Sequence, residues 1–128
     1  MNICTHKDID HTLCGRPVSV GQGSSRVELD TTAPMAVDGH GLVHGGFIFG
    51  LADHAAMIAV NDPNVVLGSA DVRFLKPVQT EETVVAEATV HGKKDKKQTV
   101  NVTVCRGNDT VFEGTFTCFV LNRHVLGR

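Results

Sequence analysis

The segment from residue 45 to residue 60, GGFIFGLADHAAMIAV, constrains the fold of this chain more than any other part of its sequence. Its apolar residues surround the helix axis instead of forming one stripe, and a helix that is apolar on every side is a buried helix. Its glycines and alanines allow strands or a second helix to approach closely. The turn-forming residues 61–64, which include Pro63, end the helix. We therefore predict a buried central helix over residues 45–60.

Most of the remaining chain has the composition and alternation of β-strands. The predicted strands cover residues 26–31, 65–75, 83–91, 99–105 and 110–121. Short connections at residues 92–97 and 107–109 are hairpin-like, and successive hairpins form an antiparallel meander. The pattern predicts an α+β fold in which a curved antiparallel sheet of five to six strands wraps around one long central helix. Because one sheet and one helix leave apolar surface uncovered, we expect a homodimer or homotetramer.

Length and charge narrow the class of protein further. The 128 residues fit a single domain over residues 1–128, with residues 1–14 packing on it as an N-terminal segment. The formal net charge of −2 gives no electrostatic footprint for nucleic acid or for an anionic membrane surface. No apolar run reaches the roughly 20 residues that span a bilayer, and the N-terminus has no apolar signal-peptide core. We therefore expect a cytoplasmic protein.

The N-terminal segment contains four side chains of metal-ligand type, Cys4, His6, His11 and Cys14. They raise the hypothesis of a zinc site. Structural zinc sites, however, usually take closely spaced ligand pairs from two knuckles or from a helix, and the sequence has no CxxC pair. A terminal segment that packs on the domain is the favoured interpretation, so we expect no metal.

Asp53 is the unusual residue of the predicted helix, because burying an unpaired carboxylate costs several kcal/mol. Either Asp53 is exposed at a rim or paired with a strand arginine such as Arg73, or it faces a ligand-sized gap where the helix meets a neighbouring subunit. At helical spacing it shares a face with Gly46 and Phe49, which suits a lined pocket. His54 points about 100° away, so we expect it to be a structural or interfacial histidine.

The loop before the helix, residues 38–46, has the sequence DGHGLVHGG. Its glycines let the backbone approach a ligand closely. The loop ends at a helix N-terminus, where free N–H groups and the helix dipole favour negative charge. A thioester carbonyl gains negative charge when it is attacked, so this position suits an oxyanion. His40, in the middle of the loop, is expected to be exposed to solvent.

The run His44-Gly45-Gly46, followed by Asp53 and Ala55, resembles the HGG-x6-D-x-A signature of hotdog-fold thioesterases. The resemblance is strongest to the PaaI-like branch, the phenylacetyl-CoA thioesterases. It extends through the strand-and-proline segment ADVRFLKP at residues 70–77 and covers about residues 15–121. HGG alone is a weak signal, whereas HGG with the spaced aspartate, the apolar helix and the later strand is specific.

The resemblance implies roles for four residues. Asp53 would act as general base on water or as nucleophile, the Gly45 N–H would polarise the thioester carbonyl, and His44 would help to shape the loop. At the fourth position, where this sequence has Asp38, the family usually has an asparagine that helps to position the reacting groups. Two neighbouring carboxylates would repel each other and raise one pKa, which could change the assignment of the base or leave a site that binds without efficient turnover.

Further residues are expected to contact the substrate. Ser69 lies near the place where the branch positions a helper hydroxyl, and Gly46 and Phe49 would line the site. Arg73 would either contact a phosphate of the substrate or be an outward-facing strand residue. The basic run at residues 93–97 is a solvated hairpin tip by default. With the resemblance it becomes a candidate for holding the phosphates of coenzyme A.

Three functions remain open at this point. The first is an acyl-CoA thioesterase that hydrolyses a small acyl or aryl thioester without a cofactor, with coenzyme A entering only as part of the substrate. The second is a non-catalytic module that binds or senses acyl-CoA, and the third is a hotdog dehydratase. The sequence contains no GxSxG elbow, Walker loop or GxGxxG fingerprint that would indicate other chemistry. Release of free thiol, no product or an enoyl thioester would separate the three functions.

Overall fold

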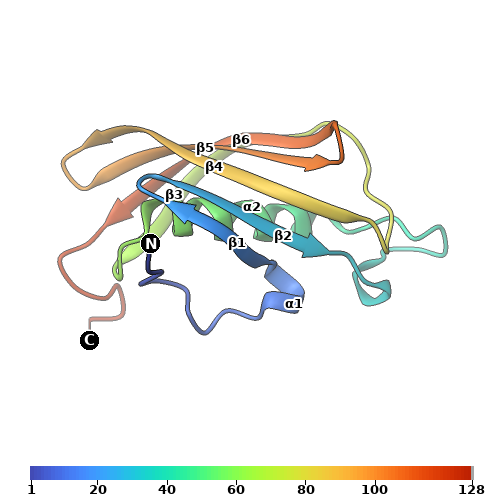
Figure 1. Ribbon diagram of the computed structural model, residues 1–128, viewed down its shortest axis with the longest axis horizontal. Helices are drawn as coiled ribbons and strands as arrows, with labels where there is room; N and C mark the ends of the chain where they lie inside the picture. The colour runs from blue at the N-terminus through green and yellow to red at the C-terminus, as the bar shows by residue number, and fades with distance from the viewer. Residues whose placement is uncertain (128) are drawn as a thin grey trace.

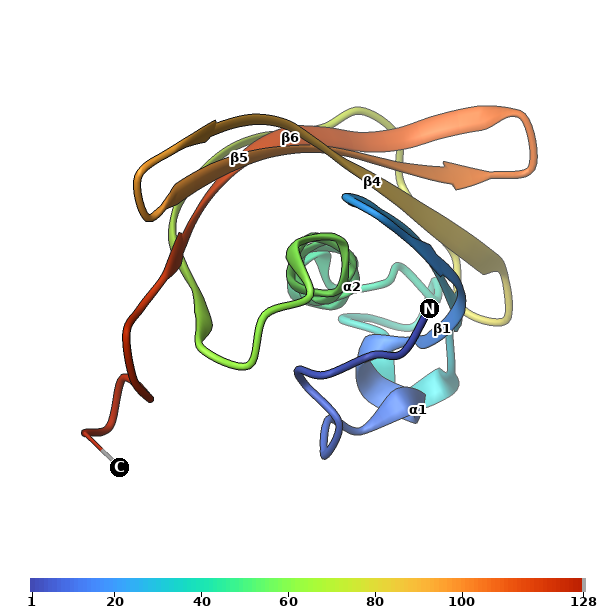
Figure 2. The same ribbon diagram turned by 60° about the vertical axis from the view of Figure 1, so that its left-hand side comes forward.

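The computed structural model describes residues 1–127 and places one long helix inside the curve of a six-stranded sheet (Figures 1 and 2). Neighbouring strands are antiparallel throughout, in the order β1-β2-β4-β5-β6-β3. The strands are β1 (Arg16–Gly21), β2 (Ser24–Asp30), β3 (Val65–Phe74), β4 (Thr83–Lys94), β5 (Lys97–Arg106) and β6 (Asp109–Val120). The helices are α1 (His11–Cys14), the 3-10 turn η1 (Ala33–Met35) and α2 (Gly45–Val60). This architecture confirms the predicted α+β hotdog fold.

Helix α2 is the centre of the hydrophobic core, as its composition predicts. Its buried residues are Ile48, Leu51, Ala52, His54, Ala55, Ala56, Met57, Ile58 and Ala59. Small side chains let strand β2 come close enough for the Ser25 hydroxyl to donate to the Ala55 carbonyl at 2.6 Å. The helix ends at Asn61, which adopts a left-handed conformation (φ 53°) and donates its N–H to the Met57 carbonyl. The predicted bounds of this helix are therefore correct.

The sheet presents one face to α2 and the other to solvent, because successive side chains of a strand point to opposite faces. Phe112 and Phe116 of β6 are fully buried, whereas Glu113 and Thr115 between them are exposed. Strand β3 lies at one edge of the sheet, paired only with β6. The inner face forms the core and the outer face is polar.

Strand β1 is absent from the prediction. It contains Pro17, which removes a backbone donor, and its register against β2 shifts between Pro17 and Ser19. Proline and an irregular register are tolerated at a sheet edge, and β1 is the edge strand opposite β3. The short strand is largely exposed, so it lacks the apolar alternation by which the other five were found. Those five differ from the prediction by only a few residues at their ends.

The N-terminal segment lies against the far end of α2. The Cys4 N–H donates to the Asn61 side-chain oxygen at 2.9 Å, and the Cys4 thiol lies 3.1 Å from the Asn61 carbonyl oxygen. Over residues 1–127 no group of three or more histidine, cysteine or acidic side chains is arranged to hold a metal ion. The hypothesis of a zinc site in this segment therefore has no support in the geometry, while the assignment of the whole chain to one domain stays a prediction.

No helix within residues 1–127 is long and apolar enough to cross a membrane.

Candidate active site around Asp53 and the start of α2

Asp53 lies near the middle of α2 with one carboxylate oxygen, Oδ1, fully buried. Within the described residues 1–127 no hydrogen-bond partner reaches this oxygen, and no salt bridge links Asp53 to Arg73. Burial disfavours the charged form and raises the pKa of the Asp53 carboxyl to about 6. The interpretation of Asp53 as one half of an ion pair is therefore wrong. A buried carboxylate oxygen without a partner costs free energy, so it calls for an explanation, and a functional site is one that supplies it.

The first turn of α2 offers free backbone donors. His44 is the N-cap residue, and its side chain makes no capping hydrogen bond within residues 1–127. The first N–H groups of a helix have no acceptor inside the helix, so those of Gly45 and Gly46 are left for a ligand. The His44 ring folds back to the place where a side chain at Gly46 would stand, 2.9 Å from a Cβ built there. Glycine at this position is therefore what lets His44 cover the start of the helix.

Asp38 occupies an exposed turn and already has a structural partner. Its side-chain oxygen accepts the His40 N–H at 2.9 Å, and its carbonyl accepts the Gly41 N–H at 3.3 Å. Burial alone raises the pKa of Asp53, so the expected repulsion from Asp38 is not its cause within one chain. Asp38 holds the loop that leads to Gly45. His40 is exposed, as predicted.

His54 follows Asp53 directly but faces the chain's own N-terminal segment. It is 1% exposed, its Nδ1 lies 3.0 Å from the Cys14 carbonyl oxygen, and its ring stacks between those of His6 and His11 at centroid distances of 6.4 and 6.2 Å. Because a carbonyl only accepts, Nδ1 donates and Nε2 is left without a partner among residues 1–127. Burial lowers the pKa of His54, and His6 and His11 lower it further against the opposing effect of the Cys14 carbonyl. These contacts agree with the predicted structural role.

The helix face around Asp53 is open. Phe49 packs against Phe116 of β6, with ring centroids 5.5 Å apart. At Gly50, one turn before Asp53, a Cβ would meet nothing within 4 Å. The face predicted from helical spacing therefore combines one acid, small residues and an aromatic wall. This arrangement leaves room for a ligand or for a second helix.

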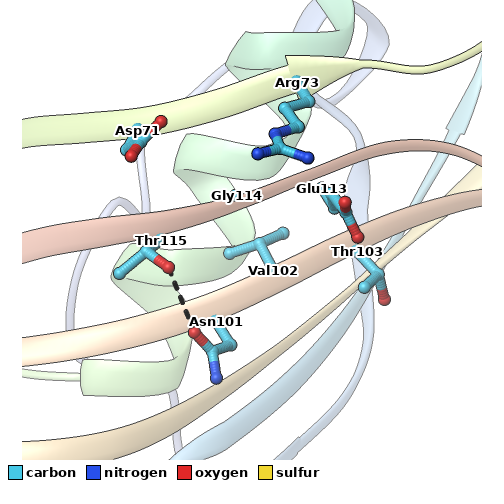
Figure 3. A pocket seen from close by; sticks show the side chains of 8 residues that line it. All are labelled: Asp71, Arg73, Asn101, Val102, Thr103, Glu113, Gly114 and Thr115. Carbon is cyan, nitrogen blue, oxygen red and sulfur yellow. Dashed lines mark hydrogen bonds between the residues drawn. The ribbon is translucent and has the colours of Figure 1, made fainter.

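Arg73 and Ser69 lie on the outer face of the sheet, away from α2. Both follow the alternation of β3, in which Phe74 points inward to Phe112 while Arg73 stands beside Glu113. Figure 3 shows Arg73 leaning over Gly114 toward Glu113, with α2 behind the sheet. The structure therefore brings Asp53, Gly46 and Phe49 onto one helix but does not bring Ser69 or Arg73 to them.

An apolar cavity of about 320 Å³ opens beside Gly45. Gly45 is a predicted site residue, but the sequence did not predict the cavity itself. Phe74, Leu75 and Leu42 stand exposed around it, with 56%, 45% and 41% of their surfaces accessible. The signal in the sequence is the pair of large apolar residues that directly precedes Lys76 and Pro77, where the strand alternation should have ended.

The model of the thioesterase superfamily matches residues 40–113, more than half of the chain, including the HGG loop, α2 and β3. The chain belongs to the thioesterase superfamily. Among solved structures, the crystal structure of protein PH1136 from Pyrococcus horikoshii is 50% identical with a TM-score of 0.98, covering 98% of this chain and 97% of that chain. A mutant of the phenylacetic acid degradation protein PaaI from Thermus thermophilus is 28% identical with a TM-score of 0.78, covering 85% and 95%. These likenesses confirm the PaaI-like hotdog assignment.

Curated relatives of this superfamily member carry other names. Methylthioribose-1-phosphate isomerase of Aquifex aeolicus is 49% identical over 123 residues, which are 95% of this chain and 27% of that protein. Transcription factor FapR of a Geobacillus species is 35% identical over 83 residues, 64% of this chain and 42% of that protein. The chain spans less than half the length of both relatives. Their names describe proteins longer than this chain.

Proposed function

We propose that this member of the thioesterase superfamily hydrolyses a small acyl-CoA-type thioester, with Asp53 as its base. The observation that carries the proposal is the carboxylate of Asp53, whose Oδ1 is buried without a partner among residues 1–127 and whose pKa of about 6 lies close to neutral pH. A general base works best when its pKa lies near the working pH, because it is then ionised and still able to take a proton. The family membership and the free N–H groups at the start of α2 support the same chemistry.

The reaction needs only groups of the chain and one water molecule. Asp53 takes a proton from water while the water oxygen attacks the carbonyl carbon of the thioester. The carbonyl oxygen becomes negatively charged and accepts hydrogen bonds from the N–H groups of Gly45 and Gly46. The carbon–sulfur bond then breaks, and the thiolate receives the proton from Asp53. The products are a carboxylic acid and free coenzyme A, and neither a metal nor an organic cofactor takes part.

The site requires two copies of the chain. Gly45 and Asp53 are eight residues apart on one helix, about 12 Å at the rise of an α-helix. One carbonyl group cannot reach donors and base over that distance. Two antiparallel α2 helices would place Gly45 of one copy beside Asp53 of the other, and the open face at Gly50 permits such an approach. The proposed enzyme is therefore an isologous homodimer, or a tetramer built from such dimers.

Thiol release tests the proposal directly. The purified protein is assayed against aryl-, short-chain and medium-chain acyl-CoA, beside Asp53→Asn. We expect turnover in the wild type and a loss of at least about a thousandfold in the variant, with an unchanged fold by circular dichroism. Equal turnover in both proteins would exclude Asp53 as the base.

A pair of variants at Gly45 tests its N–H as the oxyanion donor. Gly45→Pro removes the N–H at the first helical position, where proline is tolerated, and His44 already has the extended backbone that precedes proline (ψ 130°). Gly45→Ala adds the same Cβ but keeps the N–H. We expect Gly45→Pro to lose about a hundredfold or more in kcat and Gly45→Ala to stay within about tenfold of the wild type.

Mixing the two inactive variants tests the shared site. Co-expressed Gly45→Pro and Asp53→Asn chains form mixed dimers in which one of the two sites is intact, so about a quarter of wild-type activity should return. A site contained in one chain would recover nothing, because each chain carries one defect.

A second candidate is a module that binds acyl-CoA without cleaving it. The likeness to transcription factor FapR favours it, as does Asp38 in place of the usual asparagine. Stabilisation of the fold by acyl-CoA without thiol release across the panel would support this second candidate. Restored turnover in Asp38→Asn would then identify Asp38 as the cause.

A further inference from the structure

The cavity beside Gly45 is apolar and compact. Its floor consists of Val43, Ile48, Val78 and Val111, none of which is more than 5% exposed. Its one charged lining residue, Lys76, pairs with Asp109 at 3.1 Å. The volume of about 320 Å³ is at the small end of the range for ligand sites. It gives room for about ten groups of the size of a water molecule.

Phe74 lines this cavity next to the start of α2. Its ring packs edge-on against Phe112, at a centroid distance of 5.1 Å and an interplanar angle of 76°. Its Cε1 atom would lie 3.1 Å from a Cβ built on Gly45, so the absence of a side chain at Gly45 gives the ring its place. The aromatic wall and the proposed oxyanion donor are therefore in direct contact.

We infer that this cavity holds the acyl group of the thioester, that it selects compact acyl groups of up to about ten non-hydrogen atoms, and that Phe74 sets the limit. The inference rests on the proposed function. Gly45 lines the cavity, so an apolar chain attached to a carbonyl bound at the Gly45 N–H can enter it and gains free energy by leaving water. Leu42, Phe74 and Leu75, exposed in the free chain, are covered when such a group binds. A long acyl chain exceeds the volume and would stay in solvent.

The selectivity of thiol release tests the inference. Wild type, Phe74→Ala and Phe119→Ala are compared on straight-chain acyl-CoA from two to sixteen carbons and on aryl acyl-CoA, using kcat/KM. Phe119 is the control, since its ring covers Gly68 and does not line the cavity. We expect the wild type to prefer compact groups. Phe74→Ala should shift the preference toward chains of ten carbons or more by at least about tenfold, and Phe119→Ala should keep the wild-type profile.

A filling variant gives the opposite effect. Leu42→Trp narrows the rim, so we expect about tenfold lower kcat/KM for acyl groups of six to eight carbons with little change for acetyl-CoA. An unchanged chain-length profile in both Phe74→Ala and Leu42→Trp, or a wild type that prefers long chains, would overturn the inference. So would a loss of the dimer in Phe74→Ala with an unchanged profile, because that result assigns the cavity to contact with a second copy.

Binding separates this inference from the proposed function. Asp53→Asn binds acyl-CoA without consuming it, so dissociation constants for acyl-CoA and free CoA can be compared in this background with and without Phe74→Ala. No thiol release from the wild type, combined with a Phe74-dependent gain in affinity for compact acyl groups over free CoA, would refute hydrolysis and support the acyl cavity. Thiol release without that gain would do the reverse.

Discussion

Two consecutive residues of α2 show how one helix can carry two kinds of buried polar group. His54 faces the N-terminal segment, donates to the Cys14 carbonyl and stacks between two other histidines. Asp53 faces the side on which Gly50 meets nothing, and its Oδ1 atom has no partner among residues 1–127. Burial shifts both pKa values toward the neutral form, downward for the histidine and upward for the acid. The difference lies in their neighbours: the chain gives His54 Nδ1 a hydrogen-bond partner, and among residues 1–127 it gives Asp53 Oδ1 none.

The largest expected effect on stability is a gain from Asp53→Asn. The folded pKa of about 6 lies above the ordinary value of 3.8, so the folded state holds the proton longer and stability falls as the pH rises from about 4 to about 6. The shift of about two units corresponds to about 3 kcal/mol at pH 7.5, which the uncharged variant should regain in part. Urea unfolding of the wild type and the variant at pH 4 and pH 7.5 measures the difference in their free energies of unfolding. A variant that is less stable than the wild type by the same amount at both pH values would contradict the buried charge.

His54→Leu should have the opposite profile. It leaves the Cys14 carbonyl without its donor, which lowers the free energy of unfolding by about 1–3 kcal/mol. Thiol release per folded molecule should stay within about twofold of the wild type. If His54→Leu kept its stability and lost its activity, His54 would be the functional residue and Asp53 the structural one.

Acidification should loosen the N-terminal segment. The folded pKa values of His54 and His6 lie below 6.5, so the unfolded state binds more protons, and stability is lost as the pH falls below about 6.5. Cys14 and Asp10 border the same stack, and Asp53 lies close enough to contribute to the raised pKa of the Cys14 thiol. We expect amide exchange in residues 1–14 to become several-fold faster, relative to β4, between pH 7.5 and pH 5.5.

Gln substitutions test the origin of that loosening. The double variant His6→Gln and His11→Gln should show less of it, since two of the three neighbouring charges cannot form. The same acceleration in the variant would assign the effect to His54 alone.

The smallest effect belongs to the outer face of the sheet. Arg73→Ala removes an exposed side chain beside Glu113, so stability should change by less than about 0.5 kcal/mol and kcat/KM by less than about twofold. A rise of tenfold or more in KM would show that this face meets the substrate in the assembled protein.

The sequence predicted α2 to the residue because its composition excludes an exposed helix, and it predicted five strands because their inner residues alternate. Strand β1 was not predicted, because an edge strand that contains Pro17 needs no apolar face. The site residues on α2 followed from helical spacing. A loose alignment assigned Ser69 to the site, and Arg73 was open between an outward strand residue and a phosphate contact; a bulge between Leu67 and Ser69 fixes which β3 residues face outward. Sequence periodicity does not reveal such a bulge.

The contact between Cys4 and Asn61 limits when the N-terminal segment can pack on α2 during synthesis of the chain. The hydrogen bonds there join residues 57 positions apart, so Cys4 has no binding place until the whole of α2 has been synthesised. Strands β3 to β6, which enclose α2, are synthesised later still. The N-terminal segment therefore docks on α2 only after this helix has been made, and until then the side of the helix that carries His54 stays uncovered.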